Sequence, residues 1–224
     1  MILYSRSEQD YLKTIFDEID RCGEATTSSL AARLSVAPAS VTGMLKKLAA
    51  QNPPLVIYKK SQGANLTPEG MAVALEIIRH HRLIELFLMQ VLGYGWDEVH
   101  EEADRLEHVL SDRMEQKISD LLGNPKLDPH GAQIPDETLT MEKDPFVSLS
   151  SLKVGQKAII RSVPDGNPDL LRFLALHSLT PKEEITVLDL SPFDQNYTFQ
   201  VTSDQKKTVL GKPVAKNIYV EVIS

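Results

Sequence analysis

The chain has 224 residues, of which 42% are hydrophobic and 25% are charged, as expected for a soluble globular protein with one or two packed domains. No run of about 18 apolar residues occurs, which excludes a membrane-spanning helix. The first residues lack the basic and apolar segments of a signal peptide. Cys22 is the single cysteine, so a disulfide framework and a cysteine-based zinc site are excluded. We therefore expect a cytoplasmic protein.

The net charge of −7 is distributed unevenly along the chain. Residues 1–70 carry a net charge of +1, residues 71–144 carry −9, and residues 145–224 carry +1. Within residues 21–66, six basic side chains accompany a single acidic one, Glu24. A basic module beside a strongly acidic segment indicates separate functions. We predict three domains with these boundaries.

The first segment has the pattern of three helices followed by a hairpin. Ser7 and Asp10 resemble a helix-start capping pair, and apolar residues then recur at helical spacing until Gly23. Residues 26–28 can cap a second, short helix over 29–34, and Pro38 can begin a third. Residues 55–67 are typical of a β-hairpin with glycine in its turn. This order predicts a winged helix-turn-helix, with a helical bundle bearing a surface hairpin as the alternative.

The basic charge falls on this winged helix, which predicts binding to double-stranded DNA. The residues expected to face the bases are small, so we expect base reading through thymine methyl groups and a hydroxyl or two, while lysines bind phosphates. For Lys46 and Lys47 the alternative is a solvated helix face. The predicted DNA-binding residues are Thr27, Ser28, Ala37, Pro38, Ser40, Thr42, Lys46, Lys47, Lys59 and Lys60.

The middle segment predicts a long helix from residue 67 to about Leu92, a second over about 97–110, and a shorter one to Leu122. The apolar seam of the long helix is interrupted by His81 and Glu85, which lie one turn apart and so point the same way. An unpaired histidine or carboxylate is costly to bury, so such residues are hydrogen-bonded or metal-bound.

The next helix carries a second polar set, in which His100 and Asp104 are four residues apart and Glu107 and His108 follow. Imidazole and carboxylate without thiolate suit Mn²⁺, Fe²⁺, Zn²⁺ or Co²⁺ better than Cu⁺. Each set alone has an ordinary explanation, a buried hydrogen bond for the first and a solvated face for the second. Their occurrence on consecutive helices favours a metal site.

The last segment predicts a small β-structure. Residues 124–145 are rich in turn formers and read as a linker. Short alternating patterns at 157–163, 184–190, 197–201 and 218–222 predict strands, interrupted by an apolar stretch at 170–176, and this spacing fits a small β-barrel. His80, His130 and His177 have no partner at a suitable spacing, and we expect them to be structural.

These motifs together resemble the diphtheria-toxin-repressor family of metal-dependent transcriptional repressors. The resemblance covers essentially the whole chain, through residues 9–12, 34–42, 81–85 and 100–108, the segment around Pro129-His130-Gly131, and the C-terminal part. It implies a mainly α fold with a small β part: an N-terminal winged helix-turn-helix, a helical metal-binding and dimerisation domain, and a C-terminal SH3-like β-barrel.

The resemblance also implies a function and a set of metal ligands. The implied protein is a homodimer that binds operator DNA when loaded with divalent metal, represses metal-uptake genes, and is neither an enzyme nor a membrane protein nor a binder of a small-molecule substrate. The metal would tie the first helix to the dimerisation domain. The resemblance places a primary site at Asp10, Asp104, Glu107 and His108, and a second at His81, Glu85 and His100.

The choice of metal follows from two positions within this resemblance. The iron-responsive branch has methionine at position 10 and cysteine at position 104, whereas both are aspartate here. Hard oxygen ligands imply Mn²⁺ rather than Fe²⁺, with Zn²⁺, Co²⁺ or Cd²⁺ able to substitute in vitro. Lys13 stands where manganese regulators often carry glutamate, which argues against a close two-metal cluster.

Two questions stay open at this point, the function and a ligand of the second site. An iron-responsive regulator of the same family and a metal-dependent hydrolase are the rival functions. The C-terminal domain's usual ligands for the second site align near Asn167 and Leu170, which are poor ligands, so Asp165 or Asp169 could replace them.

Overall fold

The computed structural model describes residues 4–59, 61–142 and 145–223. These form two compact units, which are considered separately. The first contains the chain up to His81 together with Asp104–Ile118 and Pro135–Thr140, and the second contains Arg82–Ala103, Ser119–Ile134 and the chain from Met141 onward. None of the described helices is both long enough and apolar enough to cross a bilayer. The two units do not test the division into three domains, which stays a prediction from the sequence.

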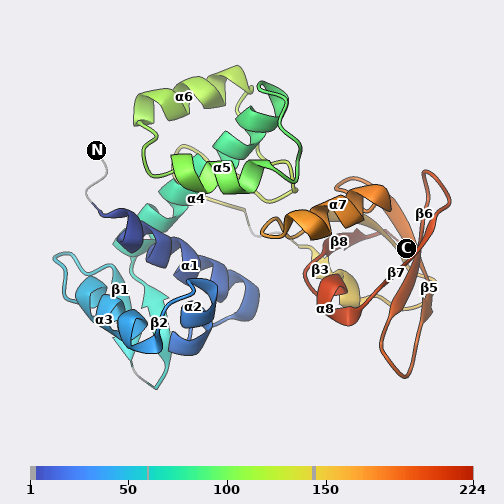
Figure 1. The fold of residues 1–224 in the computed structure, drawn as a ribbon, viewed down its shortest axis with the longest axis horizontal. Helices are drawn as coiled ribbons and strands as arrows, with labels where there is room; N and C mark the ends of the chain where they lie inside the picture. Colours follow the sequence, from blue (N-terminus) through green and yellow to red (C-terminus); the bar gives the residue numbers. More distant parts are fainter. Residues whose placement is uncertain (1–3, 60, 143–144, 224) are drawn as a thin grey trace. The chain divides into compact units, whose positions relative to one another are not determined.

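The elements follow one another as helices first and strands later (Figure 1). In chain order they are α1 (Arg6–Cys22), α2 (Thr27–Arg33), α3 (Pro38–Ala49), β1 (Val56–Lys59), β2 (Gly63–Leu66), α4 (Pro68–Gln90), α5 (Val99–Leu106), α6 (Asp112–Leu121), β3 (Val147–Ser148), a 3₁₀ turn (Leu149–Ser151), β4 (Lys157–Ser162), α7 (Pro168–Leu176), β5 (Glu184–Leu190), β6 (Tyr197–Val201), β7 (Lys207–Leu210), α8 (Lys212–Ala215) and β8 (Tyr219–Val222).

The helices α1, α2 and α3 form the predicted helix-turn-helix, and their starts follow local side-chain chemistry. The cap of α1 differs from the predicted one: Ser5 accepts from the backbone of Glu8, whose side chain returns to the Ser5 backbone, so the helix begins before Ser7. Thr26 caps α2. Pro38 occupies the first turn of α3, where its missing N–H costs nothing.

The core of this module is built from the inward faces of the three helices. Leu12 and Ile15 on α1, Leu30 on α2, and Val41 and Leu45 on α3 are fully buried. The helical spacing of these residues in the sequence is what the prediction of the module rested on.

The predicted wing is present as the antiparallel pair β1 and β2, with Val56 opposite Leu66. Gly63 begins β2 with a φ of +77°, and a Cβ there would lie 2.4 Å from the carbonyl oxygen of Ala25. The neighbouring Ala64 donates its N–H to that same oxygen at 2.9 Å. The wing is therefore attached to the start of α2. Lys60 lies outside the described residues.

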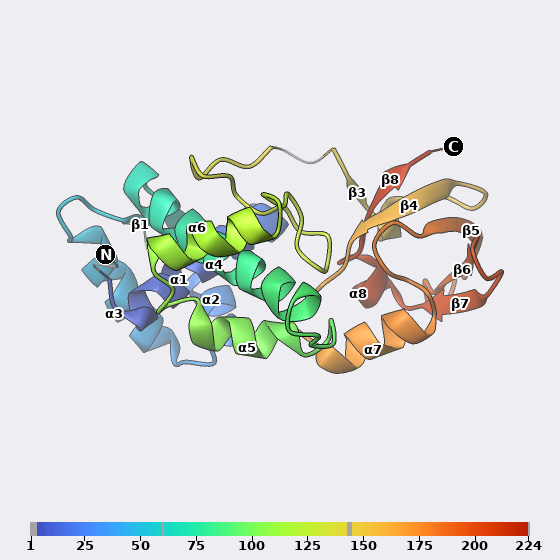
Figure 2. The ribbon, with the colours of Figure 1, turned by 90° about the horizontal axis from the view of Figure 1, so that it is seen from above.

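The helices of the middle segment are shorter than predicted. The long helix, α4, ends at Gln90 rather than near Leu92, and Gly93 follows with a φ of +77°. The next, α5, ends at Leu106 rather than Leu110, so that Glu107 and His108 lie in the turn after it. Figure 2 shows α4 and α5 from a second direction.

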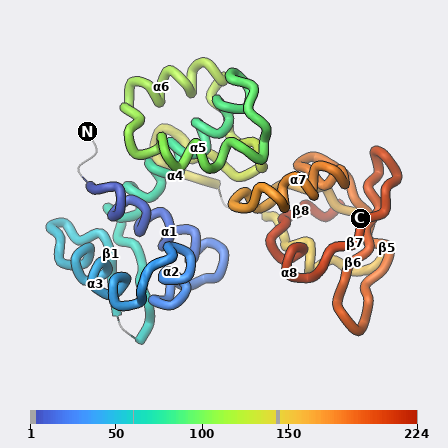
Figure 3. The backbone as a smooth tube through the Cα atoms, in the orientation of Figure 1, coloured from blue at the N-terminus to red at the C-terminus, as the bar shows by residue number. Residues whose placement is uncertain are grey.

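The C-terminal part forms one antiparallel sheet of six strands, in the order β3-β8-β4-β5-β6-β7. All four predicted strands are present, while β3 and β7 are additional, and the apolar stretch 170–176 belongs to α7 (Figure 3). Asn167 caps α7, and Leu171 and Leu174 from its inward face join Ile160 and Phe199 in the core. The short β7 was missed because Lys206 and Lys207 break the apolar alternation.

Candidate metal centres and DNA-binding surface

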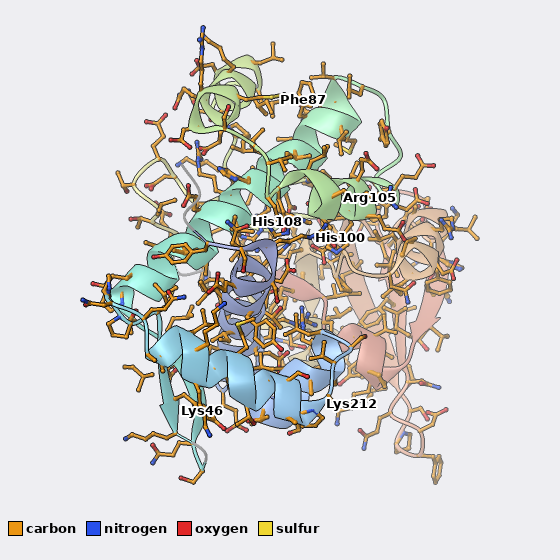
Figure 4. The ribbon with its side chains drawn as sticks, turned by 60° about the vertical axis from the view of Figure 1, so that its left-hand side comes forward. Lys46, Phe87, His100, Arg105, His108 and Lys212 are labelled. Carbon is orange, nitrogen blue, oxygen red and sulfur yellow. The ribbon has the colours of Figure 1, made fainter. Side chains whose placement is uncertain are left out.

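The first cluster of ligand-type side chains, here called the first centre, consists of Asp10, Glu107 and His108. Asp10 lies on α1, whereas Glu107 and His108 lie in the turn after α5, almost a hundred residues later. His108 is labelled in Figure 4. The His108 Nε2 is 3.0 Å from Asp10 Oδ1 and 3.4 Å from Glu107 Oε1. Glu107 is buried and Asp10 half-buried. Three of the four predicted primary-site residues therefore meet.

Gln9, which precedes Asp10 on α1, orients the imidazole of His108. Its Oε1 lies 2.6 Å from His108 Nδ1, and the Gln9 side chain is buried. Because an amide oxygen only accepts, this contact places the proton on Nδ1 and leaves the lone pair of Nε2 facing the two carboxylates. Metal-binding histidines commonly have such a partner on their second nitrogen. Residue spacing in the sequence does not indicate this role for Gln9, because the contact is made only in the folded chain.

Asp104, the fourth predicted residue of the primary site, faces a neighbouring group instead. It clusters with His81 and Glu107, and its Oδ1 is 3.3 Å from His81 Nδ1. His81 Nδ1 is also 2.5 Å from Glu107 Oε2. The ammonium of Lys13 lies among these three side chains. Burial alone would lower the pKa of Lys13, but the charges of Glu107 and Asp104 outweigh burial and raise its pKa.

The second cluster, here called the second centre, consists of Glu85, Asp128, His130 and Asp165. Glu85 was predicted together with His100, and His100 lies beside this cluster, since its Nδ1 is 3.2 Å from Glu85 Oε1 and 3.8 Å from Asp165 Oδ2. Of the two aspartates considered for a C-terminal ligand, Asp165 is therefore the one in place. Asp169 is instead exposed and pairs with Arg172. His81 remains on the same strip of α4 as Glu85, one turn earlier.

A tight loop presents Asp128 and His130 to the second centre. Asp128 Oδ1 accepts the backbone N–H groups of His130 and Ala132 at 2.8 and 2.9 Å. Gly131 has a φ of +89°, and a Cβ there would meet the carbonyl oxygen of Arg161 at 1.9 Å. The His130 carbonyl accepts from Val163 N–H at 3.0 Å, which attaches the loop to the end of β4.

The polar atoms that this loop directs inward fit a cation. Asp128 Oδ2 and His130 Nδ1 are buried and have no hydrogen-bond partner among the described residues. His130 Nε2 lies 2.8 Å from the carbonyl oxygen of Trp96, so Nε2 donates a proton there and Nδ1 is the nitrogen that a metal could take in place of a proton. A buried polar atom without a partner is costly, and a bound cation would satisfy both.

The ionisable side chains of the second centre shift one another's pKa values. Burial, together with the nearby charge of Glu85, raises the pKa of Asp128 to about 6. Burial alone would lower the pKa of His130, whereas the carboxylate of Glu85 raises it to about 9. The carboxylates that favour a proton on His130 would equally favour a divalent metal. The donors of both centres are oxygen and imidazole nitrogen, the ligands that suit Mn²⁺ and related divalent ions.

Asp128 was not considered from the sequence, and His130 was expected to be structural, because both lie in an aperiodic segment, where residue spacing says nothing about direction. The signal available was the run Asp-Pro-His-Gly itself, which places two ligand types around a turn. His80 and His177 have structural contacts: His80 Nε2 is 3.0 Å from Glu115, and His177 Nδ1 is 3.2 Å from the Thr208 hydroxyl.

The predicted DNA-binding residues lie on one module, on α2, α3 and the wing. Ser28, Ala37, Pro38, Ser40, Lys46, Lys47 and Lys59 are exposed, whereas Thr27 and Thr42 are half-buried. Thr42 donates its hydroxyl to the carbonyl of Pro38 at 3.1 Å, which reduces what it can offer to a base. Thr27, Ser28 and Pro38 line a hollow of about 360 Å³ that reaches the wing at Gly63.

The two lysines of α3 differ in their surroundings. Lys46 lies on the exposed side of the helix (Figure 4). Lys47 Nζ lies 3.2 Å from Glu8 Oε1, although 60% of its side chain is exposed. Lys47 is therefore partly neutralised before any phosphate approaches.

Comparisons with protein families cover nearly the whole chain. The model of the iron dependent repressor N-terminal DNA binding domain matches residues 4–64. The model of the iron dependent repressor metal binding and dimerisation domain matches residues 67–136, and that of the FeoA domain matches residues 147–222.

Individual relatives include both iron and manganese regulators. The iron-dependent repressor IdeR of Mycobacterium bovis is 30% identical over 189 residues, which cover 79% of this chain and 81% of the relative. The HTH-type transcriptional regulator MntR of Bacillus pumilus is 34% identical over 116 residues, which cover 52% of this chain and 78% of the relative.

Two solved structures are similar over almost their full length. A manganese-dependent transcriptional repressor in complex with manganese superimposes with a TM-score of 0.90 at 33% identity, covering 96% of this chain and 100% of the other. ScaR with bound Cd²⁺ gives a TM-score of 0.83 at 35% identity, covering 96% of this chain and 99% of the other.

The fold, the clustered ligands and these matches define a metal-dependent DNA-binding repressor. The chain belongs to the diphtheria-toxin-repressor and IdeR family, and it carries a FeoA (SH3-like) domain. It binds divalent metal and has the family's DNA-binding and dimerisation domains. Because this family consists of transcriptional repressors, the prediction that the chain is not an enzyme is confirmed and the hydrolase alternative is wrong.

Proposed function

We propose that this repressor responds to manganese, binds a palindromic operator as a homodimer, and controls genes for metal uptake. The observation that carries the metal preference is the donor set of the first centre, which is two carboxylates and one imidazole with no sulfur. Oxygen-rich sites favour Mn²⁺, whereas thiolate and thioether ligands favour softer ions. Zn²⁺, Co²⁺ and Cd²⁺ are expected to occupy the same ligands in vitro.

The first centre explains how metal would control DNA binding. When bound, the metal would supply positive charge that offsets the mutual repulsion and the desolvation of the two carboxylates, Asp10 and Glu107. His108 would be the nitrogen ligand. Asp10 belongs to α1 of the winged helix, so its attachment to the turn after α5 fixes where α1 lies. Metal binding is thereby linked to ordering of the DNA-binding module, and metal shifts the population toward the form that binds DNA.

The second centre is proposed as an additional metal site, held by Glu85, Asp128, His130 and Asp165. The support is the buried pair of atoms, Asp128 Oδ2 and His130 Nδ1, which have no hydrogen-bond partner among the described residues. Their ionic neighbours are more distant, Arg82 Nε at 3.8 Å from Asp128 Oδ2 and Glu85 Oε2 at 3.6 Å from His130 Nδ1. Asp165 comes from the chain between β4 and α7, so a metal here would attach the FeoA domain to the loop at residues 128–132.

On DNA, the dimer would place one α3 helix in each of two successive major grooves, about 34 Å apart. The exposed part of α3 offers small residues, Ala37, Pro38 and Ser40, which have few hydrogen-bond donors. Sequence reading would therefore be modest, and the lysines would contribute affinity through phosphates.

The test is metal-dependent DNA binding by variants of the first centre. A duplex is first selected from a random-sequence pool with the wild-type protein and Mn²⁺, and its affinity is then measured by fluorescence anisotropy. Asp10→Ala and His108→Ala should bind this duplex at least about tenfold more weakly at saturating Mn²⁺. Asp20→Ala, which removes an exposed carboxylate of α1, is the matched control. Undiminished binding by both variants would contradict the coupling.

Iron is the alternative metal, because iron-dependent and manganese-dependent relatives have about equal identity to this chain. Anaerobic titration of duplex binding with Mn²⁺ and with Fe²⁺ separates the two. We expect this protein to reach full DNA binding at a lower concentration of free Mn²⁺ than of free Fe²⁺. A clear preference for Fe²⁺ would replace manganese by iron in the proposal.

A further inference from the structure

A lysine side chain occupies the group formed by His81, Asp104 and Glu107. Lys13 lies on α1, three residues after Asp10, and 16% of its side chain is exposed. Its Nζ donates to Glu107 Oε2 at 2.7 Å and to Asp104 Oδ1 at 3.1 Å, and it lies 3.1 Å from His81 Nδ1. The ammonium thus contacts one ligand-type atom of every member of the group.

Without the lysine, this group has the composition of a metal site. Its two carboxylates and one imidazole offer ligand atoms that all lie within 4.8 Å of one another. The first centre, with Asp10 and His108, has the same composition and shares Glu107 with it. Two neighbouring groups of the same donor chemistry, joined by one carboxylate, are therefore present, and a side-chain cation lies in one of them.

Glu107 divides its two oxygens between these groups. Oε1 lies 3.4 Å from His108 Nε2 on the side of the first centre, and Oε2 accepts from Lys13. In two-metal sites a bridging carboxylate commonly spans cations about 3.5–4 Å apart. In this chain one of those cations would be the ammonium.

We propose that Lys13 is a built-in cation that takes the place of a second metal ion and limits this centre to one metal. The inference rests on the proposed function, because it assumes that the first centre binds a metal. It goes beyond that function by assigning the number of ions to a residue that is not itself a ligand. Lys13 is thus a specificity-determining residue for metal stoichiometry.

The charge balance of the group supports this role. Asp104 and Glu107 place two negative charges side by side, and Glu107 is almost fully buried. Removing one partner of such an ion pair leaves an uncompensated buried charge, which is unfavourable until another cation arrives. An ammonium is a compact point charge that donates hydrogen bonds, so it satisfies the carboxylates without offering a site to a metal.

The test is the number of Mn²⁺ ions bound by the full chain. Equilibrium dialysis followed by elemental analysis is carried out on the wild type, Lys13→Glu and Lys13→Met. Lys153→Glu, on an exposed turn of the FeoA domain, reproduces the charge change of the first variant and is the control. We expect one additional Mn²⁺ per chain in Lys13→Glu and Lys13→Met, with the weaker binding in Lys13→Met, and no addition in Lys153→Glu.

Electron paramagnetic resonance provides a second readout, since two Mn²⁺ ions sharing a carboxylate are magnetically coupled. The coupled signal is expected in Lys13→Glu and not in the wild type. A coupled pair in the wild type would overturn the proposal, because the lysine would then have been displaced. Equal stoichiometry in the wild type and both Lys13 variants would overturn it as well.

Thermal unfolding without metal keeps the proposal testable if Lys13→Glu folds poorly. Lys13→Met should have a lower Tm than the wild type in chelator and should gain more from added Mn²⁺, because metal then replaces the missing charge. Equal Tm values and equal gains would contradict it. A wild type that binds no Mn²⁺ at all would instead refute the proposed function, so the two failures are distinguishable.

Discussion

His108 Nδ1 lies 2.6 Å from the buried amide oxygen of Gln9, and this contact turns the other ring nitrogen of His108 toward the carboxylates of the first centre. Gln9 and Asp10 are consecutive on α1, so one turn of helix supplies both a ligand and the group that orients a second ligand. The position of α1 and the geometry of the site therefore depend on each other.

The first prediction concerns Gln9. Gln9→Met keeps the size of the side chain but removes the acceptor, so His108 loses its fixed tautomer and orientation. We expect Mn²⁺ affinity at the first centre to fall by about 10–100-fold, the usual effect of removing such a partner. Competition with a fluorescent chelator measures it.

The matched variant for Gln9 is Gln9→Glu, which retains an acceptor for the Nδ1 proton. Its Mn²⁺ affinity should equal or exceed that of the wild type, to within a few-fold, since a carboxylate makes the imidazole a stronger ligand. Equal weakening in Gln9→Met and Gln9→Glu would mean that Gln9 acts through packing alone.

The second prediction concerns the second centre. Asp128→Ala and His130→Ala should each reduce the Mn²⁺ bound per chain by one ion, while leaving the ion at the first centre in place. Asp169→Ala is the control, because Asp169 is exposed and pairs with Arg172. Elemental analysis after dialysis gives the count. Loss of metal in Asp169→Ala but not in Asp128→Ala would show that the ligands were assigned incorrectly.

The helices could be predicted because they depend on periodic spacing, whereas Asp10 was assigned to the first centre only through the family resemblance, and that ligand set stays a prediction. Leu12 and Ile15 repeat at the helical period, and Glu107 and His108 stand at fixed offsets from His100 and Asp104. The true end of α5 did not matter, since the turn that follows keeps Glu107 and His108 close to Asp10.

The second centre could be predicted only in part, because its other half lies on a loop. Glu85 and His100 were identified on helices, but the direction of Asp128 and His130 depends on Gly131 at positive φ and on the hydrogen bond from Val163, just after β4, to the His130 carbonyl. The contact of Lys13 with Asp104 and Glu107 is likewise tertiary: its sequence position raised doubt about a two-metal cluster, but only the fold shows the ammonium among the ligands.

The third prediction concerns Gly131. In Gly131→Ala the new Cβ would meet the carbonyl oxygen of Arg161 at 1.9 Å, at a φ of +89° that side chains rarely adopt. The loop must shift, so we expect a loss of about 2–4 kcal/mol in the free energy of unfolding, together with loss of the second-centre metal. Urea denaturation and metal analysis measure the two effects.

Gly123→Ala is the control for the third prediction, because Gly123 also has a positive φ but has open space where a Cβ would lie. It isolates the cost of backbone conformation from the cost of the clash. If Gly123→Ala destabilised the protein as much as Gly131→Ala, the close approach to Arg161 would have no special role.

The fourth prediction concerns the lysines of α3. Each phosphate contact contributes about 0.9 to the slope of log K against log salt concentration. Lys46→Ala should lower this slope by about 0.9, whereas Lys47→Ala should lower it by less, since Lys47 already faces Glu8 at 3.2 Å. Lys207→Ala, an exposed lysine of the FeoA domain, should leave the slope unchanged.

Glu8→Gln separates the two explanations for a weak effect of Lys47. Glu8 belongs to the capping box of α1, and burial raises its pKa, but hydrogen bonds from Ser5 and the charge of Lys47 outweigh burial and lower it. Removing that negative charge releases Lys47 for phosphate, so Lys47→Ala should have the larger effect on the salt slope in the Glu8→Gln background. If the slope changed equally in both backgrounds, Glu8 would not compete with DNA, and if it changed in neither, Lys47 would make no phosphate contact.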